Sequence, residues 1–358
     1  MKRLTLIILC LGLLVSCSPA QVNHQQVVDL LGRTVELPDE TKSFVCIGPG
    51  ALRLFSYVSE PNKIVGVEDM ERKSGGRPYL LAYHDDYSEL PIIGPGGPAN
   101  APDAERLLNS GADIIFTTYN SEARAVDALQ EQLGIPVIAL SYGDTAMYNQ
   151  EIERSLNLIG QVTGNNSRAE EVNQQLKAWL KDLEDRTSQV ADEDKPSVYL
   201  GAQSHKGSHG IESTMGQSPT LLSIQAKNIV DELDIRGYVQ LDKEVLLQTD
   251  PDIIFIDGGG LANVEADIKS NPKYYQTLSA FQNNKTYMIL PTNYYSNNIE
   301  LTFANAYYMA SILYPEAFKD IDPVKHFDEI MVFFYQKPLY SEIEEVYPRG
   351  YQQLKLLP

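Results

Sequence analysis

Residues 105–116 read E-R-L-L-N-S-G-A-D-I-I-F and residues 244–255 read E-V-L-L-Q-T-D-P-D-I-I-F, so one pattern occurs twice in the chain. Seven of the twelve positions are identical, and in both copies a Glu stands eight residues before an Asp that opens an apolar run. A leucine-rich helical turn, a break and then Asp-Ile-Ile-Phe are typical of a helix that leads into a buried parallel strand. The repeat predicts two similar α/β lobes with a ligand cleft between them.

The N-terminus has the pattern of an export signal. Two basic residues precede an apolar run over residues 4–15, which is too short to span a bilayer comfortably. The run ends on L-V-S-C, which resembles the bacterial lipobox, where cleavage before the Cys leaves a lipid-modified N-terminus. We therefore predict a signal peptide over residues 1–16 and a lipidated tether over residues 17–26, with Cys17 as the lipidated residue. An ordinary signal peptide whose apolar run ends in Cys is the alternative.

Composition and length exclude several classes of protein. The formal net charge is −19, and the sequence has no basic stripe, which argues against binding to nucleic acid or to anionic lipid. A chain of 358 residues is too long for one ordinary core and suits two. After Cys10 leaves with the signal and Cys17 takes a lipid, only Cys46 remains, which excludes an internal disulfide and a cysteine-based metal site.

Strand and helix patterns alternate in both halves of the chain, which indicates parallel sheets covered by helices on both faces. We assign an N-terminal α/β lobe to residues 27–145, connecting and bridging helices to residues 146–192, and a C-terminal α/β lobe with a helical C-terminus to residues 193–358. The strands expected in the two lobes lie at residues 44–47, 64–67, 113–117, 137–140, 198–201, 252–256 and 286–290.

The region between the lobes predicts one long helix. Apolar residues recur at helical spacing from Ala169 to Leu183, over a helix of about 23 residues that would be about 35 Å long at ~1.5 Å per residue. A helix of this length acts as a rigid strut, unlike a flexible Gly/Ser linker.

Three segments of the chain, together with the repeat, resemble sequences of one protein family. They are D-L-L-G-R-T-V-E-L-P at residues 29–38, G-V-E-D at residues 66–69, L-N-L-I-G-Q-V-T-G-N-N-S-R-A-E-E-V at residues 156–172, and both copies of the repeat. The chain resembles the substrate-binding lipoproteins of ABC importers for iron–siderophore, haem and cobalamin, over essentially the whole mature chain. The resemblance implies two small α/β lobes with central parallel sheets, joined by one long bridging helix, with the ligand cleft between the lobes. It also implies an extracytoplasmic location and an ABC permease dimer with its ATPase subunits as partner.

The sequence favours binding over catalysis. It has no G-x-S-x-G elbow, no H-E-x-x-H, no Walker loop and no Cys/His cluster, so we expect neither an enzyme nor a bound cofactor. Three consecutive glycines at residues 258–260 lack the spacing and the Lys of a phosphate loop, and a turn at the edge of the cleft is the better interpretation.

Candidate ligand-binding residues follow the predicted strands, because ligands of α/β lobes bind at the carboxyl ends of strands. Arginines on these loops would bind an anionic ferric chelate, and tyrosines would cover its organic shell. Tyr or His could also complete the coordination of Fe(III) directly, but we assign no metal ligand. The alternative is that these are ordinary surface residues of a tyrosine-rich chain. The candidates are Arg77, Tyr79, Tyr119, His209, Glu212, Tyr294 and Tyr295.

Glu105 and Glu244 occupy the same position in the two copies of the repeat. Each stands where a helix begins, and a carboxylate stabilises a helix N-terminus by about 0.3–1 kcal/mol. The family resemblance implies another role, in which one surface Glu of each lobe docks onto basic residues of the permease dimer. The matched spacing favours this docking role.

These observations predict a lipid-anchored, extracytoplasmic receptor that delivers a metal complex, an iron(III) chelate such as a ferric siderophore, to an ABC permease. Haem, cobalamin, molybdate and tungstate are alternative ligands. A chelatase-like enzyme and a sensing or scaffolding lipoprotein are alternatives of another class. Glu68, Asp69 and Asp257 lie at the same predicted cleft and would repel an anion, so the charge of the ligand stays open.

Overall fold

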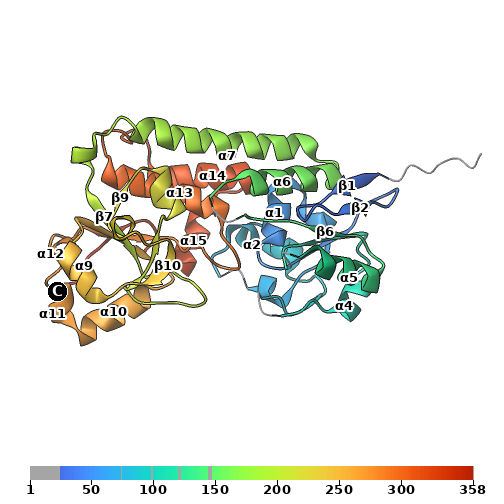
Figure 1. The fold of residues 1–358 in the computed structure, drawn as a ribbon, viewed down its shortest axis with the longest axis horizontal. Helices are drawn as coiled ribbons and strands as arrows, with labels where there is room; N and C mark the ends of the chain where they lie inside the picture. Colours follow the sequence, from blue (N-terminus) through green and yellow to red (C-terminus); the bar gives the residue numbers. More distant parts are fainter. Residues whose placement is uncertain (1–24, 74, 98–99, 120–121, 144–146, 358) are drawn as a thin grey trace, which may run out of the picture.

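The computed structural model describes residues 25–73, 75–97, 100–119, 122–143 and 147–357 (Figure 1). These residues form two α/β lobes that lie side by side, with the long helix α7 (Asn166–Thr187) along one side of both. The fold class predicted from the sequence is therefore confirmed. The predicted signal peptide and Cys17 lie outside the described residues. In the described ranges, no helix is long and apolar enough to cross a membrane.

Lobe one is built on a parallel sheet with the strand order β4-β3-β5-β6. Its central strands are buried along their whole length, as expected for parallel strands covered on both faces. A small antiparallel hairpin, β1 (Gln26–Val28) and β2 (Thr34–Glu36), precedes the sheet. The other elements are β3 (Phe44–Ile47), α1 (Ala51–Val58), β4 (Ile64–Gly66), α2 (Pro78–Ala82), α3 (His84–Tyr87), α4 (Ala104–Leu108), β5 (Ile114–Thr117), α5 (Ala123–Leu133) and β6 (Val137–Ala139).

Lobe two repeats this arrangement with the strand order β13-β12-β11-β7-β9. The parallel strands of this sheet, β7, β9, β11 and β12 in chain order, have the same spatial order as those of lobe one, and β13 adds an antiparallel edge strand. Strands β8 and β10 form a separate antiparallel pair. The prediction of a helical C-terminus omitted β13, because a strand of two residues carries no periodic pattern. The elements are β7 (Ser197–Gly201), β8 (Ser213–Gly216), α8 (Pro219–Ser223), β9 (Lys227–Asn228), β10 (Gly237–Gln240), α9 (Lys243–Thr249), β11 (Ile253–Asp257), α10 (Leu261–Ser270), α11 (Pro272–Tyr275), α12 (Ser279–Gln282), β12 (Thr286–Ile289) and β13 (Gln353–Leu354).

The Asp of each repeat copy has the same structural role. Asp113 accepts hydrogen bonds from the backbone N–H and the hydroxyl of Ser43, at 2.9 and 2.8 Å. Asp252 accepts the equivalent pair from Ser197, at 2.8 and 2.7 Å, and these bonds lower the pKa of its carboxyl. Each Asp thus ties the start of its own strand to the start of the neighbouring strand. The repeated sequence therefore encodes the same contact in both lobes, at the end of the sheet where the parallel strands begin.

A layer of helices connects the lobes. It contains α6 (Gln150–Thr163), α7, α13 (Ile299–Leu313), α14 (Pro323–Tyr335) and α15 (Tyr340–Val346). Helix α7 has 22 residues and is therefore about 33 Å long. Its Trp179 packs against Phe303 of α13 and Phe333 of α14, with ring centroids 5.5 and 5.4 Å apart. This aromatic packing joins the strut to the C-terminal helices.

Candidate ligand cleft

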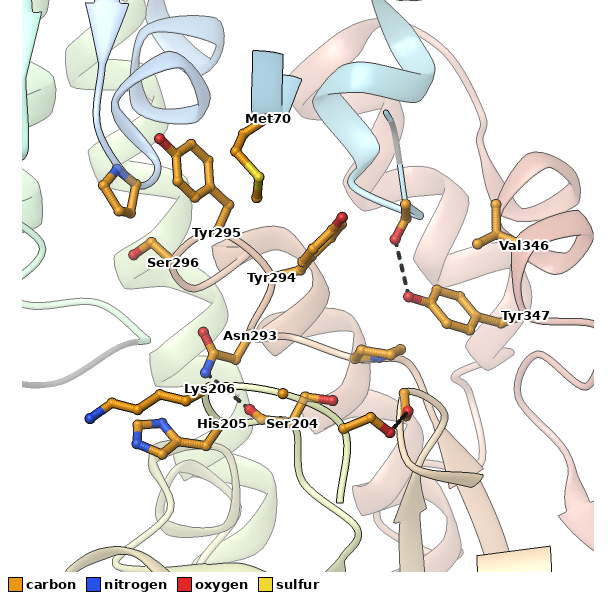
Figure 2. A pocket seen from close by; sticks show the side chains of 16 residues that line it. Met70, Ser204, His205, Lys206, Asn293, Tyr294, Tyr295, Ser296, Val346 and Tyr347 are labelled. Atoms are coloured by element: carbon orange, nitrogen blue, oxygen red, sulfur yellow. Dashed lines mark hydrogen bonds between the residues drawn. The ribbon is translucent and has the colours of Figure 1, made fainter. Parts of the chain in front are cut away.

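A cavity of about 710 Å³ lies between the lobes, at the carboxyl ends of both sheets (Figure 2). Figure 2 shows lobe one on one side of it, a loop of lobe two on the opposite side, and residues from the C-terminal third of the chain between them. The volume is in the range of ligand sites for organic molecules. The lining residues are Pro49, Met70, Gly75, Ser204, His205, Lys206, Gly207, Ser208, Gly259, Pro291, Asn293, Tyr294, Tyr295, Ser296, Val346 and Tyr347.

Lobe two contributes the loop that follows β7. The side chain of Asn293 donates to the carbonyl of Ser204 at 3.0 Å, and Ser208 donates to the carbonyl of Gly259 at 2.5 Å. The ring of His205 stacks on Tyr238 of β10, with centroids 4.2 Å apart. These contacts fix the loop so that its His, Lys and Ser side chains reach the cavity.

Tyr294 stands at the centre of the lining, against lobe one. Its ring lies over the guanidinium of Arg77, 4.6 Å from the ring centroid. Gly75 approaches the same ring so closely that a Cβ at this position would lie 2.1 Å from Cε1 of Tyr294. The carbonyl of Gly75 accepts a hydrogen bond from Tyr347 at 3.1 Å. Two tyrosines of the C-terminal part therefore close around one glycine of lobe one.

Tyr295 connects the lobes through a buried carboxyl. Its hydroxyl donates to Glu68 at 2.5 Å and accepts from the backbone N–H of Gly97 at 2.9 Å. Glu68 also accepts from the N–H of Gly48 at 3.0 Å. Burial raises the pKa of Glu68 to about 7, although the hydrogen bonds from Tyr295 and Gly48 oppose that rise.

Arg77 and Tyr79 lie beside the cavity and do not appear in its lining. Arg77 is fully buried, and it binds the carboxylate of Glu71 at 2.6 Å and the carbonyl of Met70 at 2.5 Å. Tyr79 is equally buried and donates to the same carboxylate at 2.6 Å. A buried charge needs such partners, and these satisfy much of the hydrogen-bonding capacity of Arg77 internally. The rings of Tyr294 and Tyr295, 4.6 and 5.8 Å from its guanidinium, lie between Arg77 and the cavity.

The remaining candidates occupy three places. Tyr294 and Tyr295 line the cavity together, while Tyr119 lines a second chamber of about 560 Å³ on the lobe-one side. The two chambers share Pro49 and Ser296. His209 and Glu212, expected with the tyrosines, are in neither lining.

The loop conformation explains where His209 and Glu212 lie. His209 turns back to the carbonyl of His205, with Nε2 at 2.7 Å from that oxygen, and Glu212 accepts from the N–H of Gly210. His205 and Lys206 reach the cavity in their place. Val346 and Tyr347, at the end of α15, were not expected there either. Because they lie far along the chain from the predicted strand ends, no local sequence pattern indicates that they reach the cavity.

A second buried carboxyl lies beneath the cavity. Asp257 ends β11 and accepts from the backbone N–H groups of Gly259 at 2.8 Å and Ser204 at 3.4 Å. Burial raises the pKa of Asp257 to about 7, against these two hydrogen bonds. Asp257 and Glu68 are therefore only partly ionised near neutral pH. This reduces the repulsion of an anionic ligand that the sequence suggested.

Glu105 and Glu244 are exposed, and each is the second residue of a short helix, α4 or α9. The preceding Asp, Asp103 or Asp242, caps the helix by accepting a backbone N–H with its side chain. The caps leave both Glu side chains directed to the surface in the same structural setting. In the part of the chain that the structure describes, no group of three or more His, Cys, Asp or Glu side chains is placed to hold a metal ion.

A model of the periplasmic binding protein family matches residues 51–291, which is well over half of the chain. The chain belongs to the periplasmic binding protein family, which confirms the resemblance seen in the sequence.

Three particular relatives are informative. The chain is 23% identical to the molybdate-binding protein MolA of Haemophilus influenzae, over 94% of this chain and 96% of MolA. The structure of MolA bound to molybdate is similar with a TM-score of 0.68, at 20% identity, covering 88% of this chain and 98% of that one. The uncharacterized ABC transporter substrate-binding lipoprotein YvrC of Bacillus subtilis is 20% identical over 82% of this chain and 86% of YvrC. The TroA-like periplasmic binding protein FepB of Veillonella parvula has a TM-score of 0.65 at 20% identity, covering 87% and 96% of the two chains.

The raised pKa of Asp257 predicts a pH dependence of stability. Between its ordinary pKa and about 7, the folded protein retains a proton that the unfolded chain has released, so this carboxyl makes stability fall as pH rises. Replacing Asp257 with Asn removes that titration. The melting temperature of Asp257→Asn should fall less from about pH 5 to about pH 8 than that of the wild type, by on the order of a few degrees.

Thermal unfolding at a series of pH values measures this difference. Asp234→Asn, at an exposed position of the same lobe, is the control and should keep the wild-type pH dependence. A pH dependence of Asp257→Asn that equals the wild type would show that Asp257 is ionised in the folded protein like an ordinary Asp.

Proposed function

We propose that the chain is the substrate-binding protein of an ABC importer and that it captures an organic metal complex, in first place a ferric siderophore, in the interlobe cavity. The observation that carries this proposal is the combination of a volume of about 710 Å³ with a lining surface that is largely apolar. Sites for organic ligands combine a largely apolar wall with a few polar groups that fix orientation. Met70, Val346 and the tyrosines would form the wall here.

The polar groups are suited to an anionic chelate. Lys206 and His205 bring one charge and one titratable ring to the lobe-two side of the cavity, and Ser204 and Ser208 bring hydroxyls. The metal itself would be held by the chelator. A phenolate of Tyr294 or the ring of His205 could add a donor, since hard Fe(III) favours oxygen and accepts imidazole.

Molybdate is the second candidate, and the similarity to MolA favours it. A bare oxyanion would need several hydrogen-bond donors close together, and Ser204, Lys206 and Asn293 offer donors at one end of the cavity. Such a small ligand would leave most of the apolar wall uncovered. The wall therefore favours an organic complex, with haem and cobalamin as the other members of that class.

A ligand panel separates these candidates. Isothermal titration calorimetry with a ferric catecholate, a ferric hydroxamate, haem, cobalamin and molybdate should give the tightest binding for a ferric chelate. Tyr294→Ala should weaken that binding by roughly ten- to hundredfold, equivalent to about 1.4–2.8 kcal/mol, because the central ring of the wall is lost.

Tyr274→Ala is the matched control, since Tyr274 is a partly buried tyrosine of α11 outside the cavity. It should leave the affinity at the wild-type value. Tight binding of molybdate with no heat from any ferric chelate would reject the proposed ligand and leave the class of protein intact.

Glu105 and Glu244 are proposed as docking residues for the permease dimer. A permease with twofold symmetry requires a matched pair of contacts, and exposed charges of this kind set orientation and association rate more than affinity. Glu105→Ala/Glu244→Ala should abolish ligand-dependent stimulation of the permease ATPase in liposomes, while ligand affinity and melting temperature stay close to wild type.

A second double variant controls for the loss of two charges. Glu131→Ala/Glu232→Ala removes one exposed Glu from each lobe at positions outside the repeat, and it should stimulate the ATPase normally. Normal stimulation by the Glu105/Glu244 variant would return both residues to the role of helix-start carboxylates.

Cys17 is proposed as the lipidated N-terminus of the mature protein, on the extracytoplasmic side of the membrane. In its own cells, the Cys17→Ala protein should move from the membrane fraction to the soluble extracytoplasmic fraction. Immunoblotting of fractions measures the distribution, and mass spectrometry of the wild-type N-terminal peptide should give the mass of an acylated cysteine. A Cys17→Ala protein that stays membrane-bound and unprocessed would favour an uncleaved signal anchor.

A further inference from the structure

Residues 293–297 form a turn, here called the tyrosine turn, that connects the end of β12 to α13. Asn293 and Asn297 face each other in an isolated antiparallel bridge. Between them, Tyr295 and Ser296 have φ angles of +53° and +70°, which is the left-handed backbone conformation that residues other than Gly rarely adopt. Two such residues in succession keep this conformation only if the surrounding structure holds them in it.

Arg53 supplies contacts that hold the turn. Its Nη1 donates to the carbonyl of Asn297 at 2.9 Å. Its Nη2 donates to the carbonyls of Tyr294 and Tyr295 at 3.0 and 3.2 Å. One planar guanidinium therefore binds three of the five carbonyls of the turn. A fork with fixed donor directions is well suited to this task, whereas the single ammonium of a Lys is not.

Arg53 and the tyrosine turn belong to different lobes. Arg53 is on α1 of lobe one, while the turn leaves the sheet of lobe two. The side chain of Arg53 is fully buried and is not part of the cavity lining. Lobe one also binds the hydroxyl of Tyr295 through Glu68. The turn that presents Tyr294, Tyr295 and Ser296 to the cavity is thus held in part by contacts from lobe one.

We propose that Arg53 is a positioning residue for ligand binding: it holds the tyrosine turn in its left-handed conformation, so that the wall of the cavity is complete only while lobe one engages the turn. The link to ligand affinity rests on the proposed function of the cavity. The conformational part stands on the contacts of Arg53 alone and can be tested in the protein without ligand.

The first test is hydrogen–deuterium exchange of the ligand-free protein. Arg53→Lys keeps a positive charge but loses the fork, so the amides of the tyrosine turn should exchange at least tenfold faster than in the wild type. The amides of β11 should be unchanged. Arg33→Lys is the matched control, because Arg33 is a buried Arg of lobe one that binds Asp29 and a backbone carbonyl away from the turn. It should leave exchange in the turn unaltered.

The second test is rescue by glycine. Gly adopts φ near +70° without strain, so adding Ser296→Gly to Arg53→Lys should restore at least half of the lost protection in the tyrosine turn. Gln336→Gly is the control in the same background. Gln336 has φ +58° at the end of α14 and is exposed, so Gly there relieves strain elsewhere and should not restore the turn. If Arg53 only stabilised the fold in general and did not hold this turn, the two glycine variants would show the same amide exchange in the tyrosine turn.

Binding of a ferric tris-catecholate gives the third readout. Arg53→Lys should lower its affinity at least tenfold, and the added Ser296→Gly should recover part of that loss. If the wild type does not bind this chelate, the proposed ligand fails, while the exchange data still decide the role of Arg53. Unchanged exchange and affinity in Arg53→Lys would overturn the proposal.

Should Arg53→Lys fail to fold, Arg53→Gln tests the same contacts, because its neutral amide removes the buried charge and cannot bind all three carbonyls of the turn. It should speed exchange in the tyrosine turn and leave β11 unchanged. Wild-type exchange in that variant would overturn the proposal.

Discussion

A fully buried guanidinium lies where the two lobes meet, and the arrangement of the site depends on how its charge is satisfied. Arg53 donates hydrogen bonds to three backbone carbonyls of the tyrosine turn and, at 3.2 Å, to the hydroxyl oxygen of Tyr142. The buried carboxyl of Glu300 lies close enough to interact with it electrostatically. A buried charge without partners would destabilise the folded state severely. The requirement to satisfy Arg53 therefore brings a strained turn of one lobe against a helix of the other, and this contact places the aromatic wall of the cavity.

The two lobes supply different parts of the cleft although they share one strand order. In each lobe the order reverses next to the first strand, and ligands of such sheets bind at the carboxyl ends of the strands around this point. At this point lobe one contributes a glycine-rich turn and the buried Glu68. Lobe two contributes the loop of His205 and the buried Asp257 at the equivalent point. The polar loop and the two carboxyls of raised pKa place titratable groups at the cleft, while the tyrosines give it an apolar surface.

The sequence predicted what its repeated and periodic patterns encode. The Asp-Ile-Ile-Phe copies predicted β5 and β11, and the spacing of apolar residues from Ala169 to Leu183 predicted α7 to within one residue of its length. Tyr294 and Tyr295 were expected at the cleft because they follow a predicted strand, and both line the cavity.

Contacts between distant segments were beyond such patterns. Arg77 was expected to face the ligand, but Glu71 and two backbone carbonyls hold it inside lobe one. His205 and not His209 reaches the cavity, because the path of a loop depends on contacts such as the stacking on Tyr238. Val346 and Tyr347 come from the far end of the chain. Packing of α15 brings them to the cleft, and no local sequence signal reports that packing.

Native mass spectrometry of protein purified from its own cells would show whether this cleft carries an organic metal complex. We expect a bound mass that contains a metal with the isotope pattern of iron together with an organic chelator. That mass should be lost when the same measurement is made on Tyr294→Ala. A bare oxyanion retained by the wild-type protein would show instead that the cleft does not carry an organic metal complex.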